Sequence, residues 1–462
     1  MSLPAHELEP EDQHTAQLVT PDMIHEIMEA VRAGRGDIAR ELVERLSPAG
    51  IAHVLEQIAA EERRDLVQLI DLKLEPEAVI ELDEEVRNDV IQSMAPRDIA
   101  AIASELDSDD AADIIGDLDE AERRAVLAQM PAEERANVEA SLSYEDGTAG
   151  RLMQHELAKV PQGWTVGEII DYFRESAEEL PEDFYDVFVV DEADRPVGVV
   201  ALGSLVRTKR PTPVAELMER DIRILPVSAP QEEVAHLFRD ENLISCPVVD
   251  PQGRLVGVIT VDDVVDVIDE EAGRDLLGMA GVSEVDIFAD VGRTAAARFA
   301  WLFVNLLTAL LASSVIGLFE TEIAKVVALA VLAPIVASMG GNAGTQTLAV
   351  AVRALAMNEL TVTNALRFIG KEMVVGTFNG ILFALITGMV AALWFADWRI
   401  GAIIGAALVV NLLAAAMAGT LIPLTLERLG IDPAVASVVF LTTVTDVIGF
   451  FAFLGLATLF LM

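Results

Sequence analysis

The stretch FLTTVTDVIGFFAFLG, residues 440–455, places a single aspartate in the middle of an apolar run. The run extends from Pro433 to Leu461, which is long enough for a helix to cross a bilayer, and Asp446 lies near its midpoint. A carboxylate at that depth costs several kcal/mol, and ionisable groups inside a membrane commonly mark a path for ions or protons. The stretch therefore predicts a membrane-spanning helix that carries a functional acid.

Two structural explanations for Asp446 stay open beside the functional one. The first is a basic partner, although none of the expected spans has a Lys or Arg near its midpoint. The second is a protonated carboxyl group that is hydrogen-bonded to a neighbouring hydroxyl, for which Thr442, Thr443 and Thr445 are the candidates.

Five segments are long and apolar enough to cross a membrane. They are Phe299–Phe319, Ile323–Val350, Met373–Phe395, Ile400–Leu424 and Pro433–Leu461. If the N-terminal half is inside, the inner flanks carry six Lys/Arg and the outer loops carry two, which agrees with the positive-inside rule. We therefore expect a multi-pass protein of the plasma (bacterial inner) membrane, with cytoplasmic N-terminal domains and its C-terminus outside.

The charge of the chain is confined to its N-terminal part. Residues 292–462 hold eight Lys/Arg and eight Asp/Glu, so the net charge of −43 belongs to the first 291 residues. This excess of carboxylates argues against nucleic acid as a partner, because nucleic-acid affinity comes mostly from Lys/Arg that meet phosphates. Two interpretations remain: a soluble, self-repelling surface, or carboxylates that cations neutralise.

The sequence carries few signs of covalent or catalytic chemistry. Its single cysteine, Cys246, excludes a disulfide within the chain and a multi-cysteine zinc site, which suits a reducing cytosol. No HExxH, no phosphate-binding loop and no G-x-G-x-x-G that opens a helix is present, so we expect no enzyme. The first residues lack the basic and apolar regions of a cleaved signal peptide, so membrane insertion is expected to depend on the later spans.

Residues 21–145 are expected to form an acidic helical superhelix. From Pro21 to about Leu142 the apolar residues are spaced as in short amphipathic helices. The segment LSPAGIAHVLEQI, residues 46–58, is echoed by MAPRDIAAIASEL, residues 94–106, with the same proline and the same apolar spacing. Such repeated helices predict a small α-solenoid, and residues 1–20 before it are expected to be disordered.

Residues 146–270 contain a second repeat of a different kind. VFVVDEADRPVGVVALGSLV, residues 187–206, recurs as CPVVDPQGRLVGVITVDDVV, residues 246–265, with an offset of 59. Each copy is typical of a strand, an Asp/Gly turn, a second strand and the start of a helix. The segment resembles a tandem pair of cystathionine-β-synthase (CBS) modules, which are α/β domains. This resemblance implies at most one ATP site per chain, at Thr260 and Asp263 of the second copy, because Ala201 replaces the threonine in the first.

The expected fold class is therefore multidomain. It combines an α-solenoid, an α/β tandem CBS pair, a connecting helix over residues 271–294 and an all-α transmembrane domain of five helices over residues 295–462. The segment 270–301 is interpreted as one helix that leads directly into the first span. A direct helical link would couple the two halves mechanically.

Small and polar residues gather in the second span, in PIVASMGGNAGTQTLAV, residues 334–350. Its three glycines allow close helix approach, which small-residue packing alone would explain. Its amide side chains need partners or water inside the bilayer, and its proline frees a backbone carbonyl. Together with Asp446, Thr442 and Thr443, these residues predict a water-filled cation path. The residues of the second span in question are Pro334, Gly340, Gly341, Asn342, Gly344 and Gln346.

One aspartate per chain is a weak cation site. In a two-fold dimer with Asp446 on the axis, two carboxylates would face each other and match a divalent ion. Mg²⁺ gives up its water reluctantly, so a pore need only hold the hydrated ion through carboxylates and carbonyls. The oxygen-only inventory favours hard cations in general. We therefore expect a homodimer, surrounded by membrane lipid, that holds a divalent cation such as Mg²⁺, whereas the residues alone leave the choice among Mg²⁺, Mn²⁺, Co²⁺, Zn²⁺ and Ca²⁺ open.

The order of acidic helical domain, CBS pair, connecting helix and five spans resembles the MgtE family of magnesium channels and transporters. The six second-span residues match the family's signature, and TTVTDVIGF, residues 442–450, matches its fifth span, where the family's pore aspartate falls on Asp446. The resemblance covers nearly the whole chain after residue 20 and implies a homodimeric Mg²⁺ pore that intracellular Mg²⁺ closes. One departure is Val438–Val439, where many members have Gly-Pro or Asn-Pro.

Carboxylates of the soluble half are candidates for sensing that ion. Asp109, Asp113 and Asp117 lie at successive turns of one helical face, beside Asp110. Like charges at that spacing destabilise a helix by a few tenths of a kcal/mol per pair, and bound Mg²⁺ would reverse the sign; a solvated acidic face is the alternative. The resemblance adds further acids, with Arg274 where the family can carry one more. The added residues are Glu232, Asp263, Asp266, Glu271 and Asp275.

We expect Mg²⁺ at high internal concentration to bridge the solenoid, the CBS pair and the connecting helix, and so to hold the pore closed. When Mg²⁺ falls, repulsion between uncovered carboxylates separates these parts. The alternative is an ion-coupled exchanger or exporter of divalent cations that a nucleotide regulates at the CBS pair. The sequence does not separate a carrier from a channel, whereas a CBS-containing scaffold without transport is disfavoured by the amides of the second span and by Asp446.

Overall fold

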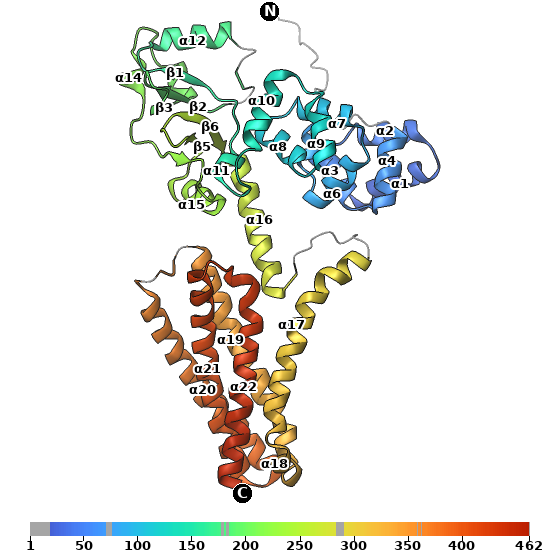
Figure 1. Cartoon of the computed structure of the whole chain (residues 1–462), viewed down its shortest axis with the longest axis vertical. Coiled ribbons are helices and arrows are strands. Elements are labelled where there is room, and N and C mark those ends of the chain that lie inside the picture. The colour runs from blue at the N-terminus through green and yellow to red at the C-terminus, as the bar shows by residue number, and fades with distance from the viewer. Residues whose placement is uncertain are drawn as a thin grey trace, which may run out of the picture. The chain divides into compact units, whose positions relative to one another are not determined.

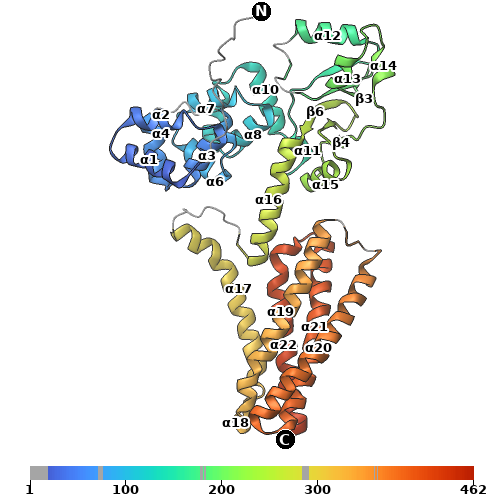
Figure 2. The same cartoon turned by 180° about the vertical axis from the view of Figure 1, so that it is seen from behind.

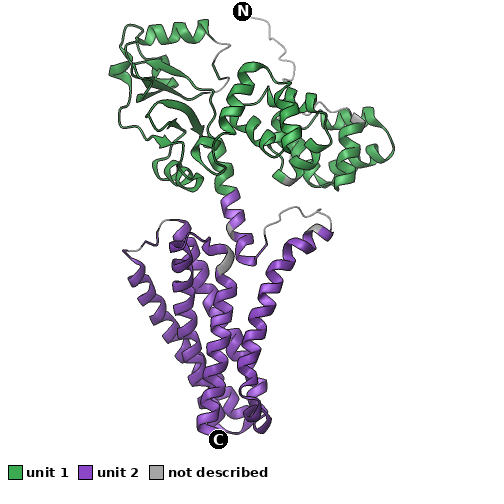
Figure 3. Ribbon diagram, viewed as in Figure 1, with its two compact units in different colours: residues 1–269, 285–289 green, residues 270–284, 290–462 purple. Residues whose placement is uncertain are grey.

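The computed structural model describes residues 19–70, 76–176, 180–181, 184–282, 291–357, 359–361 and 363–461. These residues form two compact units, of which unit 1 ends at Asp269 and unit 2 begins at Glu270 (Figure 3). The segment expected to be disordered, residues 1–20, lies outside the described residues except for its last two. Figures 1 and 2 show the elements of each unit from opposite sides.

The N-terminal part of unit 1 is a stack of short helices around one apolar core. The helices are α1 (Pro21–Arg32), α2 (Gly36–Val43), α3 (Pro48–Glu56), α4 (Ala60–Ile70), α5 (Pro76–Ile80), α6 (Glu84–Gln92), α7 (Pro96–Ala103), α8 (Ser108–Gly116), α9 (Glu120–Leu127) and α10 (Ala132–Ser141). The two echoed segments form α3 and α7, and each helix begins with its proline, where a missing N–H costs nothing. α2 contacts α4, α4 contacts α6, α7 contacts α9 and α8 contacts α10. The predicted helical stack is confirmed.

The remainder of unit 1 is the predicted pair of α/β modules. Its elements are α11 (Ala149–Leu152), β1 (Lys159–Pro161), α12 (Val166–Glu175), β2 (Asp186–Val190), β3 (Pro196–Ala201), α13 (Leu202–Arg207), α14 (Val214–Leu217), β4 (Leu225–Pro226), α15 (Gln231–Glu241), β5 (Ser245–Val249) and β6 (Leu255–Thr260). The sheets β1-β2-β3 and β4-β5-β6 have the same topology, because each middle strand is parallel to the first and antiparallel to the third. Even the register shift recurs, at Val189/Val190 and at Val248/Val249.

The repeat extends to the turns between the paired strands. Asp191 accepts the N–H groups of Ala193 and Arg195, and Asp250 accepts those of Gln252 and Arg254 in the same way. Equivalent left-handed positions follow, held by Asp194 (φ 60°) in the first copy and by Gly253 (φ 80°) in the second. Asp and Gly are residues that tolerate this conformation.

The described residues of unit 2 include five helices long and apolar enough to cross a membrane. Its elements after the connecting segment are α17 (Val291–Gly317), α18 (Glu320–Lys325), α19 (Ala328–Ala356), α20 (Ala365–Phe395), α21 (Trp398–Arg428) and α22 (Pro433–Leu461). α19, α21 and α22 contact one another and lie side by side in both views (Figures 1 and 2). α21 is the central helix, with 67% of its spanning window buried, compared with 6% for α17 and 11% for α20.

The predicted spans need correction at their ends. The first helix stops at Gly317, and the short α18 occupies the point where the second span was expected to begin. The third helix starts at Ala365 and not at Met373, so that Lys371 and Glu372 lie inside it. Charged residues end an apolar run without ending the helix, because backbone hydrogen bonding continues past the hydrocarbon region.

The expected uninterrupted link into the first span is wrong. The connecting helix α16 (Val261–Ala280) ends at Gly281, which has a left-handed φ of 70°. The N–H of Gly281 donates to Gly278 O at 2.9 Å and that of Val282 to Leu277 O at 3.0 Å. This is a glycine-based helix stop, which satisfies the final carbonyl groups. Residues 283–290 lie outside the described residues.

Candidate ion-binding sites

Asp446 lies in the middle of α22 and is half-buried in the protomer. Its carboxylate has no hydrogen bond or ion pair within the described part of the chain. The neighbouring hydroxyls are used elsewhere: Thr443 donates to Val439 O at 2.7 Å and Thr445 to Thr442 O at 3.1 Å. Neither of the two structural explanations, a basic partner or a hydroxyl partner, is therefore present among the described residues.

α19 presents one polar stripe on its exposed side. Pro334, Ser338, Asn342 and Gln346 are all exposed and follow one another at intervals of four residues, which places them on one face of the helix. The amide of Asn342 donates to the hydroxyl of Ser338 at 3.4 Å. Pro334 lies inside the helix without ending it. The amide side chains of the second span are thus exposed in the protomer, although amide groups in lipid need hydrogen-bond partners.

The three glycines of the second span have different neighbours. A Cβ at Gly344 would lie 2.7 Å from Leu441 of α22, and the Gly344 carbonyl lies 2.9 Å from the Cβ position of Gly419 in α21. This position is therefore a place of close helix approach. A Cβ at Gly341 would have nothing within 4 Å, whereas one at Gly340 would meet the side chain of Asn411 at 2.2 Å.

Asn411 of α21 is a buried amide that the sequence analysis missed. It is 0% exposed, and its Nδ2 donates to Val336 O of α19 at 2.8 Å. A Cβ at Gly449 of α22 would also lie 2.7 Å from Nδ2, so the amide is packed between the glycines of two helices. The reasoning that singled out Asp446, a polar side chain inside an apolar run, applies equally to Asn411.

A second acid of unit 2 was missed because the third span was begun too late. Glu372 of α20 is half-buried and accepts a hydrogen bond from Thr347 of α19 at 3.1 Å. In contrast to Asp446, this carboxylate therefore has a partner in its own protomer.

Carboxylates of unit 1 gather at the first turns of α8 and α16. Asp109 and Asp110 lie in the first turn of α8, and Asp263 lies in that of α16. Burial raises the pKa of all three, and nearby carboxylates raise it further, to about 8 for Asp110 and about 7 for Asp263. A cation bound beside them would favour the ionised forms instead. Among the described residues, no three His, Cys, Asp or Glu side chains are arranged so that they could hold a metal ion.

The expected acidic face of α8 is divided. α8 ends at Gly116, so Asp117 is its C-terminal cap, and Asp109 is buried whereas Asp113 and Asp117 are exposed. Arginines neutralise the exposed pair: Arg151 lies 3.0 Å from Asp113, and Arg87 lies 3.3 Å from Asp117. The face is therefore neither bare nor uniformly solvated.

Hydrogen bonds also join the helical stack to the CBS pair. Glu156, just before β1, accepts hydrogen bonds from the hydroxyl of Ser108 at 2.7 Å and from Asn137 at 3.1 Å. Arg151 of α11 is buried and donates to Ala112 O at 2.8 Å. These contacts hold α8 against the CBS pair without a metal ion.

The remaining predicted residues lie apart from this cluster. Glu232 in α15 and Asp266 in α16 are exposed, and Asp275 lies in α16 with its side chain outside the described atoms. Glu271 pairs with Arg274 at 2.5 Å, so the arginine that replaces a family acid makes a salt bridge within its own helix.

The candidate nucleotide residues are joined to each other. The hydroxyl of Thr260, at the end of β6, donates to the carboxylate of Asp263 at 2.6 Å. Asp263 therefore belongs both to this pair and to the carboxylate cluster.

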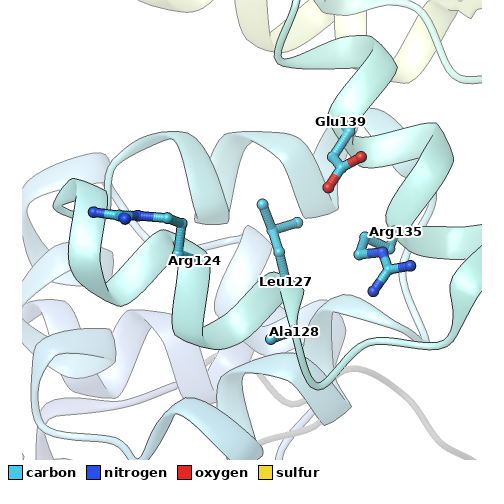
Figure 4. Close-up of a pocket in the computed structure, with 5 residues that line it drawn as sticks. All are labelled: Arg124, Leu127, Ala128, Arg135 and Glu139. Carbon is cyan, nitrogen blue, oxygen red and sulfur yellow. The ribbon is translucent and has the colours of Figure 1, made fainter.

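A shallow pocket of about 310 Å³ on α9 and α10 has none of these residues in its lining (Figure 4). Arg124, Leu127, Ala128, Arg135 and Glu139 line it. The Arg124 and Arg135 side chains extend to opposite sides of Leu127 in Figure 4, so they do not converge on one anion. Arg124 is also paired with Glu120 at 3.4 Å.

Comparison with curated proteins decides the family. The chain is 37% identical over 328 residues to "Magnesium transporter MgtE" of Thermus thermophilus, covering 70% of this chain and 72% of that protein. It is 30% identical over 442 residues to the protein of the same name from Bacillus subtilis, covering 95% of this chain and 98% of that one. The chain belongs to the MgtE family. The resemblance expected from the sequence is thereby confirmed.

The MgtE-family regions follow one another along the chain in the expected order. The MgtE intracellular N domain matches residues 46–147, the CBS domain matches residues 149–210 and 214–270, and the MgtE divalent cation transporter region matches residues 333–456. The polar stripe of α19, Asn411 and Asp446 all lie within the transporter region.

Two of the solved structures similar to parts of the chain are described as pieces of magnesium-transport proteins. One is the cytosolic domain of the Mg²⁺ channel MgtE in complex with ATP, with 33% identity, a TM-score of 0.48, and coverage of 53% of this chain and 99% of that one. Another is the soluble part of a magnesium transporter, with 28% identity, a TM-score of 0.47, and coverage of 54% and 98%.

Proposed function

We propose that this MgtE-family chain transports Mg²⁺ across the plasma membrane as a homodimer, with unit 1 in the cytoplasm and the C-terminus outside. The observation that carries the proposal is the carboxylate of Asp446, at the midpoint of α22 and without a partner among the described residues. The names of the curated relatives, which are magnesium transporters, support Mg²⁺ as the ion. The chain acts as a transporter and not as an enzyme.

The ion path uses oxygen atoms of α19 and α22. Thr442 and Thr443 donate their protons to carbonyl groups of α22, which leaves the hydroxyl lone pairs free to accept from the water shell of an ion. Asn342 supplies an exposed amide on α19. Two copies of Asp446 across a two-fold axis would balance a divalent charge, and Mg²⁺ would keep most of its water.

Internal Mg²⁺ closes this path by binding the cytoplasmic carboxylates. The raised pKa values of Asp110 and Asp263 reflect burial beside other negative charges, which a divalent cation relieves. Met279, in the last turn of α16, packs against an apolar cluster that includes Leu348 of α19 and Leu441 of α22, so a movement of α16 would disturb packing between the proposed pore helices. A shift from mostly closed to mostly open requires roughly 5 kcal/mol of differential binding, within reach of several weak sites.

A nucleotide at the second CBS copy modulates the same cluster. ATP would take Asp263 as a ribose ligand and Thr260 as a phosphate ligand, and so compete with cation binding at Asp263. Thr260→Ala should therefore weaken ATP binding to the full chain, measured by calorimetry. Equal ATP affinities of the variant and wild type would remove this site from the account.

Growth of a magnesium-auxotrophic strain at limiting Mg²⁺ tests the transport proposal. Wild type should restore growth, and Asp446→Ala should not, although both reach the membrane in equal amounts. Glu427→Gln is the control, because it removes an exposed carboxylate at the C-terminal end of α21. Full growth with Asp446→Ala would contradict the proposal.

Single-channel recording separates the pore from an ion-coupled carrier. Turnover beyond about 10⁵ ions per second indicates a pore, because the conformational cycle of a carrier takes microseconds to milliseconds or longer. A lower turnover that depends on Na⁺ or H⁺ would favour the carrier.

A further inference from the structure

Asn411 connects the two helices of the proposed ion path. It lies on α21, is 0% exposed, and donates through Nδ2 to Val336 O of α19 at 2.8 Å. Gly340 of α19 and Gly449 of α22 face its amide group so closely that a Cβ would lie 2.2 Å and 2.7 Å from Nδ2. This one side chain of α21 therefore contacts two other spans, α19 and α22, and each has a glycine where it meets the amide.

The amide is not explained by stability alone. Donation to Val336 O fixes its orientation, because a flipped amide would place Oδ1 against that carbonyl oxygen. Oδ1 is then buried with no hydrogen-bond partner among the described residues. A buried acceptor without a partner destabilises a fold, and an apolar side chain of the same shape would avoid that cost.

The contacts of Asn411 lie next to the proposed ion ligands. Val336 and Gly340 stand on either side of Ser338, which belongs to the polar stripe of α19. Gly449 follows Asp446 by one turn of α22. The position of the amide therefore determines how deep the stripe and the acid lie relative to each other.

We propose that Asn411 is a positioning residue, which holds the polar stripe of α19 and the carboxylate of Asp446 at a common depth in the membrane. The inference rests on the proposed function, because it assigns Asn411 a task in the same ion path. Asn411 itself does not contact the ion.

Two measurements on the full-length protein test this role. The first is Mg²⁺ uptake into proteoliposomes, with its maximal rate and half-saturating concentration, and the second is the thermal midpoint in detergent. Asn411→Leu should reduce maximal uptake by at least about tenfold through misplacement of the ligands. Its thermal midpoint should stay within about 3 °C of wild type, because the partnerless acceptor is removed together with the hydrogen bond.

The chain offers matched controls in the same helices. Thr420→Val removes another fully buried polar group of α21, whose hydroxyl bonds only to Ala416 O and Met417 O of its own helix, and should leave uptake unchanged. Gly449→Ala should lower both uptake and thermal midpoint, whereas Gly455→Ala, whose Cβ would have nothing within 4 Å, should lower neither. Adding Asn411→Ala to Gly449→Ala should restore the thermal midpoint but not the uptake.

The outcomes distinguish this inference from the proposed function. If wild type takes up no Mg²⁺, the proposed function fails and the inference fails with it. If wild type is active and Asn411→Leu is equally active, or loses uptake only in proportion to lost folded protein, Asn411 is merely structural and this inference alone is overturned.

Discussion

Six of the described candidate carboxylates fall into three groups that differ in what balances their charge. Asp113 and Asp117 meet arginines, and Glu372 accepts from a hydroxyl. Asp110 and Asp263 are half-buried beside other acids, which raises the pKa of both carboxyl groups. Asp446 differs from both groups, because nothing described in its own protomer balances it. In the last two groups a cation would supply the positive charge that the chain does not.

The buried pair predicts a pH dependence at the residue scale. Burial raises the pKa of Asp110 to about 8 and that of Asp263 to about 7, above the unfolded value of about 3.9. Between these values the folded state binds more protons than the unfolded chain, so without divalent ions the stability of unit 1 falls as pH rises from about 4 to 8. Calorimetry of the full chain in EDTA should give a lower thermal midpoint at pH 8.5 than at pH 6.

Added Mg²⁺ should reverse the effect, with a larger rise in the midpoint at pH 8.5, where the acids are ionised. The double variant Asp110→Asn with Asp263→Asn should lose most of both responses. An equal thermal midpoint at pH 6 and pH 8.5 in EDTA would show that Asp110 and Asp263 are ionised at both pH values, and that burial does not raise their pKa values into this range.

At the scale of elements, the end of α16 decides how the connecting helix meets the first span. Gly281 stops the helix in a left-handed conformation, and a Cβ there would lie 1.8 Å from the indole Nε1 of Trp301 in α17. The connecting helix therefore rests against the first span by direct packing at its stop, in place of the continuous helix expected from the sequence.

Gly281→Ala should disturb that packing. A residue with a Cβ at this φ costs roughly 1–2 kcal/mol, and the clash moves either the helix end or Trp301. We expect raised Mg²⁺ flux at saturating internal Mg²⁺, measured in proteoliposomes, because α16 no longer holds its closed position. Gly273→Ala, in the same helix with nothing within 4 Å of its Cβ, is the control and should retain closure. If both variants close equally at saturating internal Mg²⁺, the end of α16 at Gly281 has no role in gating.

The sequence predicted the elements better than their ends or their partners. The CBS sheets were predicted because the repeat of Val, Asp and Gly fixes strand, turn and strand twice. The third span was begun too late at Met373, because Lys371 and Glu372 look like the end of a helix although they continue it. Asp446 was found because it lies at the midpoint of an apolar run, and its position along the chain is enough to show this.

Contacts between helices are a different matter. Gly340 contacts Asn411, and Arg151 pairs with Asp113. These contacts depend on how the helices pack, and the spacing of residues along the chain does not predict them.

At the scale of the whole molecule, the net negative charge and the membrane-spanning helices belong to different parts of the chain. The net charge of −43 belongs to the first 291 residues, and the five spans belong to unit 2. Like charges in a soluble domain repel one another at low divalent-ion concentration and are drawn together when such ions bind. In the proposed mechanism, this charge serves as the sensor for the ion that the molecule transports.

Neutralising the sensor should uncouple flux from internal Mg²⁺. In the variant with Asp109, Asp113, Asp263 and Asp275 all changed to alanine, proteoliposome flux should stay high as internal Mg²⁺ is raised, because binding no longer favours the closed state. Wild type should close over the same range. A variant whose flux still follows internal Mg²⁺ as wild type does would remove these residues from the sensor.

The most direct test of the account asks whether position 446 lies in water. Asp446→Cys is treated with a membrane-impermeant, charged thiol reagent; the native Cys246 stays silent because burial raises the pKa of its thiol to about 12. Phe451→Cys, an exposed apolar position on the same helix, is the control for a surface that faces lipid. The account predicts rapid labelling at 446 that Mg²⁺ slows, and none at 451. Folded protein that remains unlabelled at 446, or is labelled equally at both positions, would contradict an ion path through Asp446.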